Sequence, residues 1–167
     1  GKLLAEWWGK LEPGCEFRPT PSSGGWATPE LRGHFLVAGD LVTTATRFPF
    51  TVECKLREGW AWATMLAGKR SPVWGWWAQC ERAALEENRH PLLVFRRSRE
   101  AWHAIMGWRF VVEKLGYGVH VKWWTKERLV ARGIDSDLAM VRLADLLALD
   151  PELVASPASR ELLASGT

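Results

Sequence analysis

Residues 48–55 read Phe-Pro-Phe-Thr-Val-Glu-Cys-Lys, and Asp40 lies thirteen positions before Glu53, in the segment Gly-Asp-Leu-Val that begins at Gly39. Enrichment in β-branched and aromatic residues predicts two neighbouring strands over 35–44 and 48–55, arranged as a meander. Residues two apart in a strand share a face, so Glu53 and Lys55 project to one side while Cys54 points into the core. We therefore expect two carboxylates and one ammonium group to meet here.

These groups together suit a particular chemistry. Asp40, Glu53 and the backbone carbonyl of Cys54 offer hard oxygen ligands, which suit Mg²⁺ because that ion keeps several waters and also accepts phosphate oxygens. A bound Mg²⁺ lowers the pKa of a coordinated water and neutralises charge on a scissile phosphate. Lys55 would orient the water or stabilise the transition state. The alternative interpretation is a solvent-facing Glu–Lys ion pair, which is common and contributes little.

The flanking segments predict alternating helices and strands. Apolar spacing favours an opening helix from Leu3 to near Pro13, followed by a short strand over 15–19 and a turn-rich loop over 20–26. Ser71 before Pro72 predicts the start of a helix. We expect this helix to run to about residue 88 and a buried strand to follow over 91–95. Beyond residue 99, the expected elements are a strand over 119–124, a helix over 125–133, an amphipathic helix over 137–149, and short helices that begin at 150 and 156.

Length and composition exclude several classes of protein. A chain of 167 residues with 47% hydrophobic and 25% charged residues is typical of about one folded domain. No apolar run reaches the roughly 18–20 residues that a membrane helix requires. Three cysteines without a C-x-x-C pair favour a reducing compartment, so we expect a cytoplasmic location. A single Asn and a single Gln favour a thermophilic source.

Charge is distributed unevenly along the chain although its net value is only +3. Residues 1–60 hold seven bases and seven acids, residues 61–132 hold thirteen bases and six acids, and residues 133–167 hold two bases and six acids. A basic middle segment suggests a surface that faces a polyanion, because Lys and Arg contacts to phosphate supply most non-specific affinity for nucleic acid. A merely solvated basic face is the alternative.

The order of these features resembles a known family. Residues 2–99 look like an archaeal-type Holliday junction resolvase of the PD-(D/E)xK nuclease superfamily. The matching features are Glu6 in the first helix, the loop Arg18-Pro-Thr-Pro-Ser-Ser-Gly-Gly25, Asp40, the Glu53-x-Lys55 strand, and a following helix with Gln79. Gly39 stands where the superfamily has proline. The resemblance implies an α/β, restriction-endonuclease-like mixed β-sheet flanked by helices, with residues 1–99 as nuclease core. Residues 100–167 have no counterpart in the family, and we expect them to form a mainly helical extension packed on the same domain.

The resemblance also implies roles for individual residues. Asp40 and Glu53 would be metal ligands with the Cys54 carbonyl, and Lys55 would position the attacking water. Glu6 would be an auxiliary metal ligand or an acid on the phosphate side. Ser23, or as the second choice Ser22, would be the loop hydroxyl near the scissile phosphate, and Gln79 would face the site. Each of these residues also has a purely structural interpretation. Glu6 would form an ion pair on the first helix, Ser22 and Ser23 would shape a turn, and Gln79 would be a surface amide. The basic groups expected to contact DNA, with Ser22, are Lys2, Lys10, Arg18, Lys69, Arg70, Arg96, Arg97 and Arg99.

The resemblance thus implies a Mg²⁺-dependent homodimer, with Mn²⁺ as a possible substitute, that nicks four-way DNA junctions symmetrically. A gene of a thermophilic phage, expressed in the host cytoplasm, fits this resemblance; neither a membrane nor a small-molecule cofactor is expected. The alternatives are another PD-(D/E)xK nuclease of replication, restriction or exonuclease type, a non-catalytic DNA-binding protein, or a Trp-rich protein-interaction module.

Overall fold

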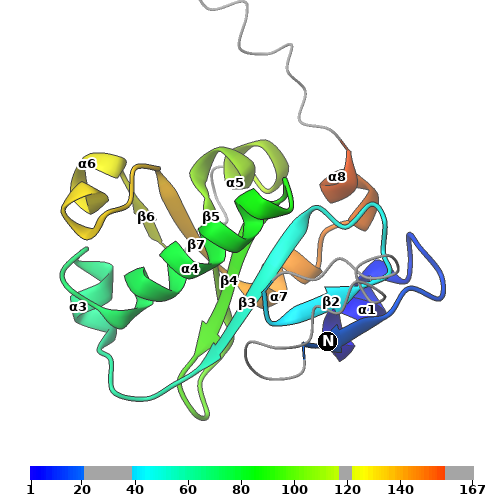
Figure 1. The fold of residues 1–167 in the computed structure, drawn as a ribbon, viewed down its shortest axis with the longest axis horizontal. Coiled ribbons are helices and arrows are strands. Elements are labelled where there is room, and N and C mark those ends of the chain that lie inside the picture. The colour runs from blue at the N-terminus through cyan, green and yellow to red at the C-terminus, as the bar shows by residue number, and fades with distance from the viewer. Residues whose placement is uncertain (21–38, 117–121, 157–167) are drawn as a thin grey trace, which may run out of the picture.

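The computed structural model of the protein describes residues 1–20, 39–116 and 122–156. A five-stranded mixed sheet in the order β3-β4-β5-β7-β6 forms its centre, and β1 and β2 form a separate antiparallel pair (Figure 1). The strands are β1 (Phe17–Pro19), β2 (Leu41–Thr43), β3 (Phe50–Leu56), β4 (His90–Arg96), β5 (His103–Gly107), β6 (Lys122–Trp124) and β7 (Leu138–Arg142). The expected mixed sheet flanked by helices is therefore confirmed.

Helices cover both faces of the sheet. They are α1 (Lys2–Trp8), α3 (Trp62–Leu66), α4 (Pro72–Glu86), α5 (Trp108–Lys114), α6 (Lys126–Leu129), the short 3₁₀ helix η1 (Val130–Arg132), α7 (Leu143–Leu147) and α8 (Pro151–Ala155). Alternate residues of the central strands point to opposite faces. Leu93 and Phe95 pack with α4 in one core, whereas Leu92 and Val94 belong to the core that includes α1 and α5.

The β3–α4–β4 unit is formed as the sequence predicts. Ser71 is the N-cap of α4 and its hydroxyl accepts a hydrogen bond from the backbone N–H of Val73, while Pro72 occupies the first turn. β3 and β4 are parallel neighbours, with Glu53 opposite Leu93 and Lys55 opposite Phe95. Glu53 and Lys55 therefore lie on the face that α4 covers.

The C-terminal third departs from the prediction. Residues after 99 were expected to form a mainly helical extension with one strand over 119–124 and a helix over 125–133. β6 and the α6–η1 segment lie where that strand and that helix were expected. However, β5 and β7 add two more strands, and the amphipathic helix expected over 137–149 is instead β7 followed by the short α7. β7 lies between β5 and β6 and is buried on both faces. Such a strand reads as a continuous apolar run, which periodicity alone does not distinguish from a helix. The suggested boundary between residues 99 and 100 falls between β4 and β5, which are hydrogen-bonded neighbours.

The expected meander is also wrong. β2 pairs with β1, with Val42 opposite Arg18, rather than running antiparallel to β3. In the described structure, the segment just before β2 joins β3 through an isolated parallel bridge between Gly39 and Val52. Asp40 consequently enters the site beside the outer edge of β3, from a segment parallel to that strand.

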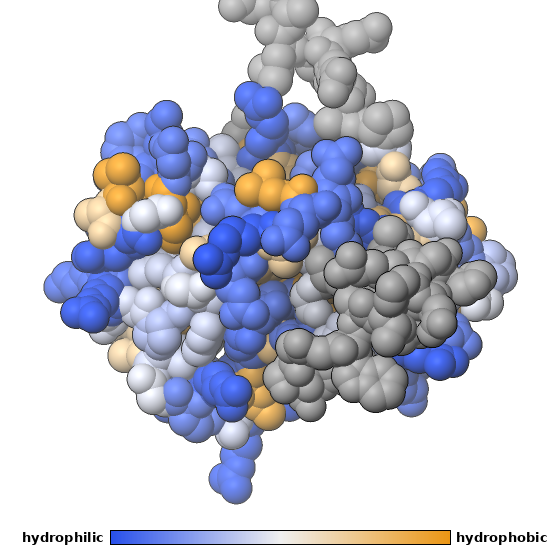
Figure 2. Space-filling model, in the orientation of Figure 1, coloured by the Kyte–Doolittle hydropathy of each residue, from blue (hydrophilic) through white to orange (hydrophobic). Residues whose placement is uncertain are grey.

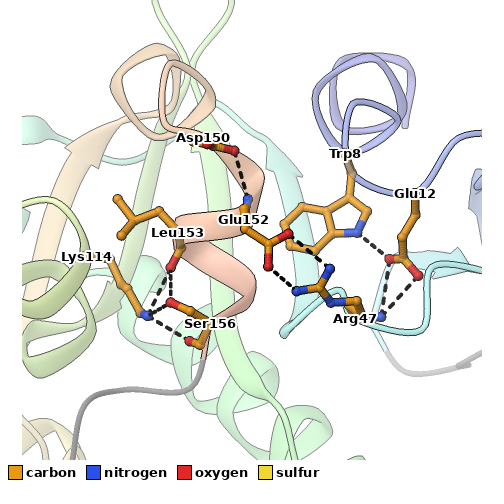
Figure 3. A network of polar contacts seen from close by, with 8 residues as sticks. All are labelled: Trp8, Glu12, Arg47, Lys114, Asp150, Glu152, Leu153 and Ser156. Carbon is orange, nitrogen blue, oxygen red and sulfur yellow. Dashed lines mark hydrogen bonds and ion pairs between the residues drawn. The ribbon is translucent and has the colours of Figure 1, made fainter.

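A network of polar contacts ties the C-terminal helix α8 to the N-terminal part of the chain (Figure 3). Glu12 accepts hydrogen bonds from the indole N–H of Trp8 at 2.6 Å and from the backbone N–H of Arg47 at 3.2 Å. The Arg47 guanidinium donates to both carboxylate oxygens of Glu152 at 3.1 and 2.5 Å. On the other side of α8, the buried Lys114 ammonium donates to the carbonyl oxygens of Leu153 and Ser156.

The surface is mostly polar, with apolar residues scattered over it in the view of Figure 2. In the described parts of the chain, no helix is both long enough and apolar enough to cross a membrane.

Candidate active site

Strand β3 carries two charged side chains toward the α4 face of the sheet. Glu53 is only 1% exposed, and one of its carboxylate oxygens forms an ion pair and a hydrogen bond with the Lys55 ammonium. The Lys55 side chain is 17% exposed and its Nζ also lies 3.8 Å from Oδ2 of Asp40. The structure therefore brings together Asp40, Glu53 and Lys55, as the sequence predicted.

Backbone contacts fix Asp40 at the edge of β3. Its N–H donates to the Val52 carbonyl at 2.8 Å, and its Oδ2 accepts a hydrogen bond from the Cys54 N–H at 2.8 Å. Thr20 holds the segment from the other side, because its N–H donates to the Asp40 carbonyl at 2.9 Å and its hydroxyl to the Gly39 carbonyl at 3.0 Å. Four hydrogen bonds thus determine where the Asp40 carboxylate points.

Gly39 makes this approach possible. Its φ is +79°, in the left-handed region that side chains disfavour, and a Cβ there would overlap the Val52 carbonyl oxygen and lie 3.1 Å from the carbonyl carbon. Sequence analysis did not identify Thr20 or Gly39 as site residues. The only available signal was the Gly-Asp pair itself, and its meaning depends on the parallel bridge.

The Cys54 carbonyl lies at the same edge. A residue's N–H and C=O point to the same side of a strand, and the Cys54 N–H points to Asp40, so its carbonyl faces the Asp40 edge as well. The thiol projects to the opposite face, against the core that includes α1. Burial raises its pKa to about 11, which keeps the thiol neutral. Burial likewise raises the pKa of Cys80, on α4, to about 12.

The electrostatics of Glu53 differ from those of an ordinary surface carboxylate. Burial raises its pKa, and the nearby negative charge of Asp40 acts in the same direction, whereas the hydrogen bond and positive charge of Lys55 lower it. The net result is a pKa above the usual value. A cation bound between the two carboxylates would remove their repulsion and stabilise the ionised form of Glu53.

The donor set fits a hard divalent cation. It consists of two carboxylates and one backbone carbonyl, so waters and substrate oxygens would have to complete an octahedral shell, as Mg²⁺ prefers. Among the described residues, no group of three or more His, Cys, Asp or Glu side chains could hold a metal ion. A third side-chain ligand from Glu6 is therefore not part of this arrangement.

The other predicted catalytic residues either form no hydrogen bond or ion pair with this cluster in the described structure or lie outside the described residues. Glu6 is exposed on α1, where its carboxylate lies 3.8 Å from the Lys2 ammonium. Gln79 is exposed on α4, one residue before the buried Cys80. Ser22 and Ser23 lie outside the described residues. In the described structure, neither Glu6 nor Gln79 forms a hydrogen bond or an ion pair with Asp40 or Glu53.

Several of the basic residues predicted to contact DNA have partners within the chain. Arg18 is paired with Glu16 at 2.7 Å, and Arg97 with Glu58 at 3.3 Å. The Arg96 guanidinium lies over the Trp102 ring, 4.4 Å from its centroid. Lys10, Lys69, Arg70 and Arg99 are exposed, and within the described ranges they form no ion pair.

Comparison with known proteins agrees with this geometry. Residues 1–152 match the family described as "Phage putative PDDEXK endonuclease". No curated protein matches the chain, and no solved structure does. The match extends from α1 through β7 into α8, so it includes the Asp40–Glu53–Lys55 cluster and all five strands of the central sheet. The chain therefore belongs to this phage PDDEXK endonuclease family, and it is a nuclease of the PD-(D/E)xK type.

Proposed function

We propose that this nuclease is a Mg²⁺-dependent endonuclease that resolves four-way DNA junctions. The convergence of Asp40 and Glu53 on Lys55, at the edge where the Cys54 carbonyl points, is the observation that carries the proposal. The resolvase-like order of Glu6, the Arg18–Gly25 loop, Asp40, Glu53-x-Lys55 and Gln79 supports the choice of a branched substrate.

Asp40, Glu53 and the Cys54 carbonyl would hold the ion, and Mn²⁺ would serve as a substitute. A divalent ion bound by these oxygens would supply an activated water and neutralise charge on the phosphate that is attacked. Lys55 lies between the two carboxylates and, as a compact ammonium, orients the attacking water and stabilises negative charge on the phosphate. The hydrogen bond from the Cys54 N–H keeps Asp40 in place throughout. Hydrolysis adds the water to phosphorus and breaks one P–O bond of the DNA backbone.

A junction with two-fold symmetry needs two equivalent sites, so a homodimer is the natural assembly. Sedimentation of the free protein and of its junction complex measures this directly. A monomer that cuts both strands of one junction with equal efficiency would contradict the proposed assembly.

The decisive experiment compares cleavage of a labelled four-way junction with cleavage of a linear duplex of equal length. Each substrate is incubated with Mg²⁺, with Mn²⁺ and with EDTA. The proteins are the wild type, Asp40→Asn, and Asp135→Asn as a matched control, because Asp135 is exposed and far along the chain from the site. We expect paired symmetric nicks in the junction alone, lost with EDTA or Asp40→Asn and retained in Asp135→Asn.

Other outcomes change the conclusion. Equal cutting of the linear duplex would replace junction resolution by a general endonuclease of the same superfamily. Binding without any cutting would favour a non-catalytic DNA-binding role. Single variants Glu6→Gln, Gln79→Ala, Ser22→Ala and Ser23→Ala, assayed in the same way, determine which of these residues contribute to cleavage.

A further inference from the structure

The turn between α3 and α4 is held by two tryptophans from different elements. The indole N–H of Trp124, on β6, donates to the Leu66 carbonyl at 3.2 Å, and that of Trp74, on α4, donates to the Lys69 carbonyl at 2.7 Å. The two rings contact each other edge to face, with centroids 5.2 Å apart. The main chain of this turn is therefore held by hydrogen bonds from two elements, β6 and α4.

Two arginines from the α6–η1 segment converge on this turn at Gly68. Gly68 is buried with φ +68°, and the position of a Cβ there would be 3.1 Å from Cγ and 3.4 Å from Nε of Arg128. Nε of Arg132 donates to the Gly68 carbonyl at 3.4 Å. Glycine thus lets the stem of Arg128 lie directly on the turn. The next two residues are Lys69 and Arg70, whose side chains are exposed.

We call Lys69, Arg70, Arg128 and Arg132 the basic patch. All four are exposed, and in the described part of the chain none of them is in an ion pair. Arg18, Arg47 and Arg97, by contrast, are each paired with a glutamate. Glu127 is the adjacent acid on α6, and its pKa is lowered chiefly by hydrogen bonds with its own backbone and Thr125, with Lys126 adding to the effect.

Four cations held together without carboxylate partners repel one another, and a polyanion would relieve that repulsion. In Figure 2 the left part of the molecule, where Figure 1 places α3 and α6, shows strongly hydrophilic residues beside a few hydrophobic ones. The patch lies on the α4 side of the sheet, the side to which Glu53 and Lys55 also project. A DNA duplex that reaches Lys55 could therefore continue over α4 toward this turn.

We propose that the basic patch binds the phosphate backbone of a DNA duplex arm outside the cleavage site. The proposal rests on the proposed function for the choice of DNA as the polyanion. It adds Arg128 and Arg132, which sequence analysis did not assign, and gives Lys69 and Arg70 a common role. Because the contacts are to phosphates, they position the duplex and do not read its sequence.

The test is duplex and junction binding, measured by fluorescence anisotropy in EDTA over a range of salt concentrations. The main variant is Lys69→Gln/Arg70→Gln, because these side chains are exposed and make no hydrogen bond within the described structure. A second variant, Arg128→Gln/Arg132→Gln, removes the other half of the patch, and Arg128→Lys/Arg132→Lys keeps its charge. The control Arg109→Gln removes a charge from an exposed position on α5, which packs against the opposite face of the sheet.

Each phosphate contact contributes about −0.9 to the slope of log affinity against log salt. We expect each Gln double variant to make this negative slope shallower by about 2. Binding at about 0.1 M salt should weaken by at least about tenfold, equally for duplexes of different base sequence. The Lys variant and the control should stay near the wild type. Equal losses in patch and control variants, or no loss in the patch variants, would overturn the proposal. Because binding is measured without metal, these outcomes are independent of whether the protein resolves junctions.

Discussion

Two carboxylate clusters in this molecule are built in opposite ways. Glu12 accepts hydrogen bonds from Trp8, Thr46 and the backbone of Arg47, and although partial burial acts to raise its pKa, these bonds bring it below the usual value. Glu53 is more deeply buried, and in the described structure the one hydrogen-bond partner of its carboxylate is the side chain of Lys55. Burial therefore dominates, and the pKa of Glu53 rises.

The difference separates stability from function. Fixed donors around Glu12 stabilise its charged form and join the N-terminal helix to the segment before β3. A carboxylate buried beside another carboxylate and one flexible cation costs folding free energy, because desolvation exceeds what the ion pair returns. Perturbed ionisable groups of this kind concentrate at functional sites. The two clusters should respond to mutation in opposite ways.

The largest expected effect concerns Glu53. Glu53→Gln should lower cleavage by at least about 10²-fold, because a metal ligand is lost. The free energy of unfolding should not fall, since a buried amide costs less than a buried carboxylate. Lys55→Met should also abolish cleavage, yet destabilise the fold by up to about 3 kcal/mol by leaving Glu53 unpaired. Urea unfolding and junction cleavage measure the two quantities. A large loss of stability in Glu53→Gln would contradict the comparison.

The second prediction concerns the glycine that positions Asp40. Gly39→Ala should lower cleavage by about 10²-fold and weaken Mn²⁺ binding measured by calorimetry, because the Val52 carbonyl occupies the space of the new methyl group. Gly14→Ala is the matched control: its φ is +83°, but nothing lies within 4 Å of the added Cβ. Both variants carry about 1 kcal/mol of backbone strain. If both lost cleavage equally, strain alone would explain the result and Gly39 would have no positioning role.

The parts of the site that local chemistry determines could be predicted from the sequence. The Glu53-x-Lys55 spacing specifies one face of a strand, and Ser71-Pro72 specifies the start of α4, so both could be predicted from residue types alone. The pairing of β2 with β1 and the burial of β7 depend on neighbours far along the chain. Residues 138–141 are apolar throughout, and only the position of β7 between two strands decides that this segment forms a strand rather than a helix.

The third prediction concerns Glu12. Glu12→Gln should lower the free energy of unfolding by about 1–2 kcal/mol, a modest value because the side chain is partly solvated. A carboxylate whose pKa is lowered in the folded state contributes stability above its unfolded pKa of 4.5, and that contribution is lost as the pH falls through its folded value. The difference between wild type and Glu12→Gln should therefore be largest near neutral pH and shrink below pH 4.5. Cleavage by the variant should equal that of the wild type at a temperature where both are folded.

The smallest effect should come from the outer ion pair of the same network, between Arg47 and Glu152 (Figure 3). Both side chains are about half exposed, at 46% and 57%, so solvent screens their attraction even though the contact is bidentate. Glu152→Gln should destabilise the protein less than Glu12→Gln does, and the difference from wild type should vanish at about 1 M salt, where the screening length is roughly 3 Å. Urea unfolding at low and high salt measures it. A loss as large as that of Glu12→Gln, and insensitive to salt, would mean that α8 is held by this ion pair and not by the contacts of Lys114 and the apolar core beneath it.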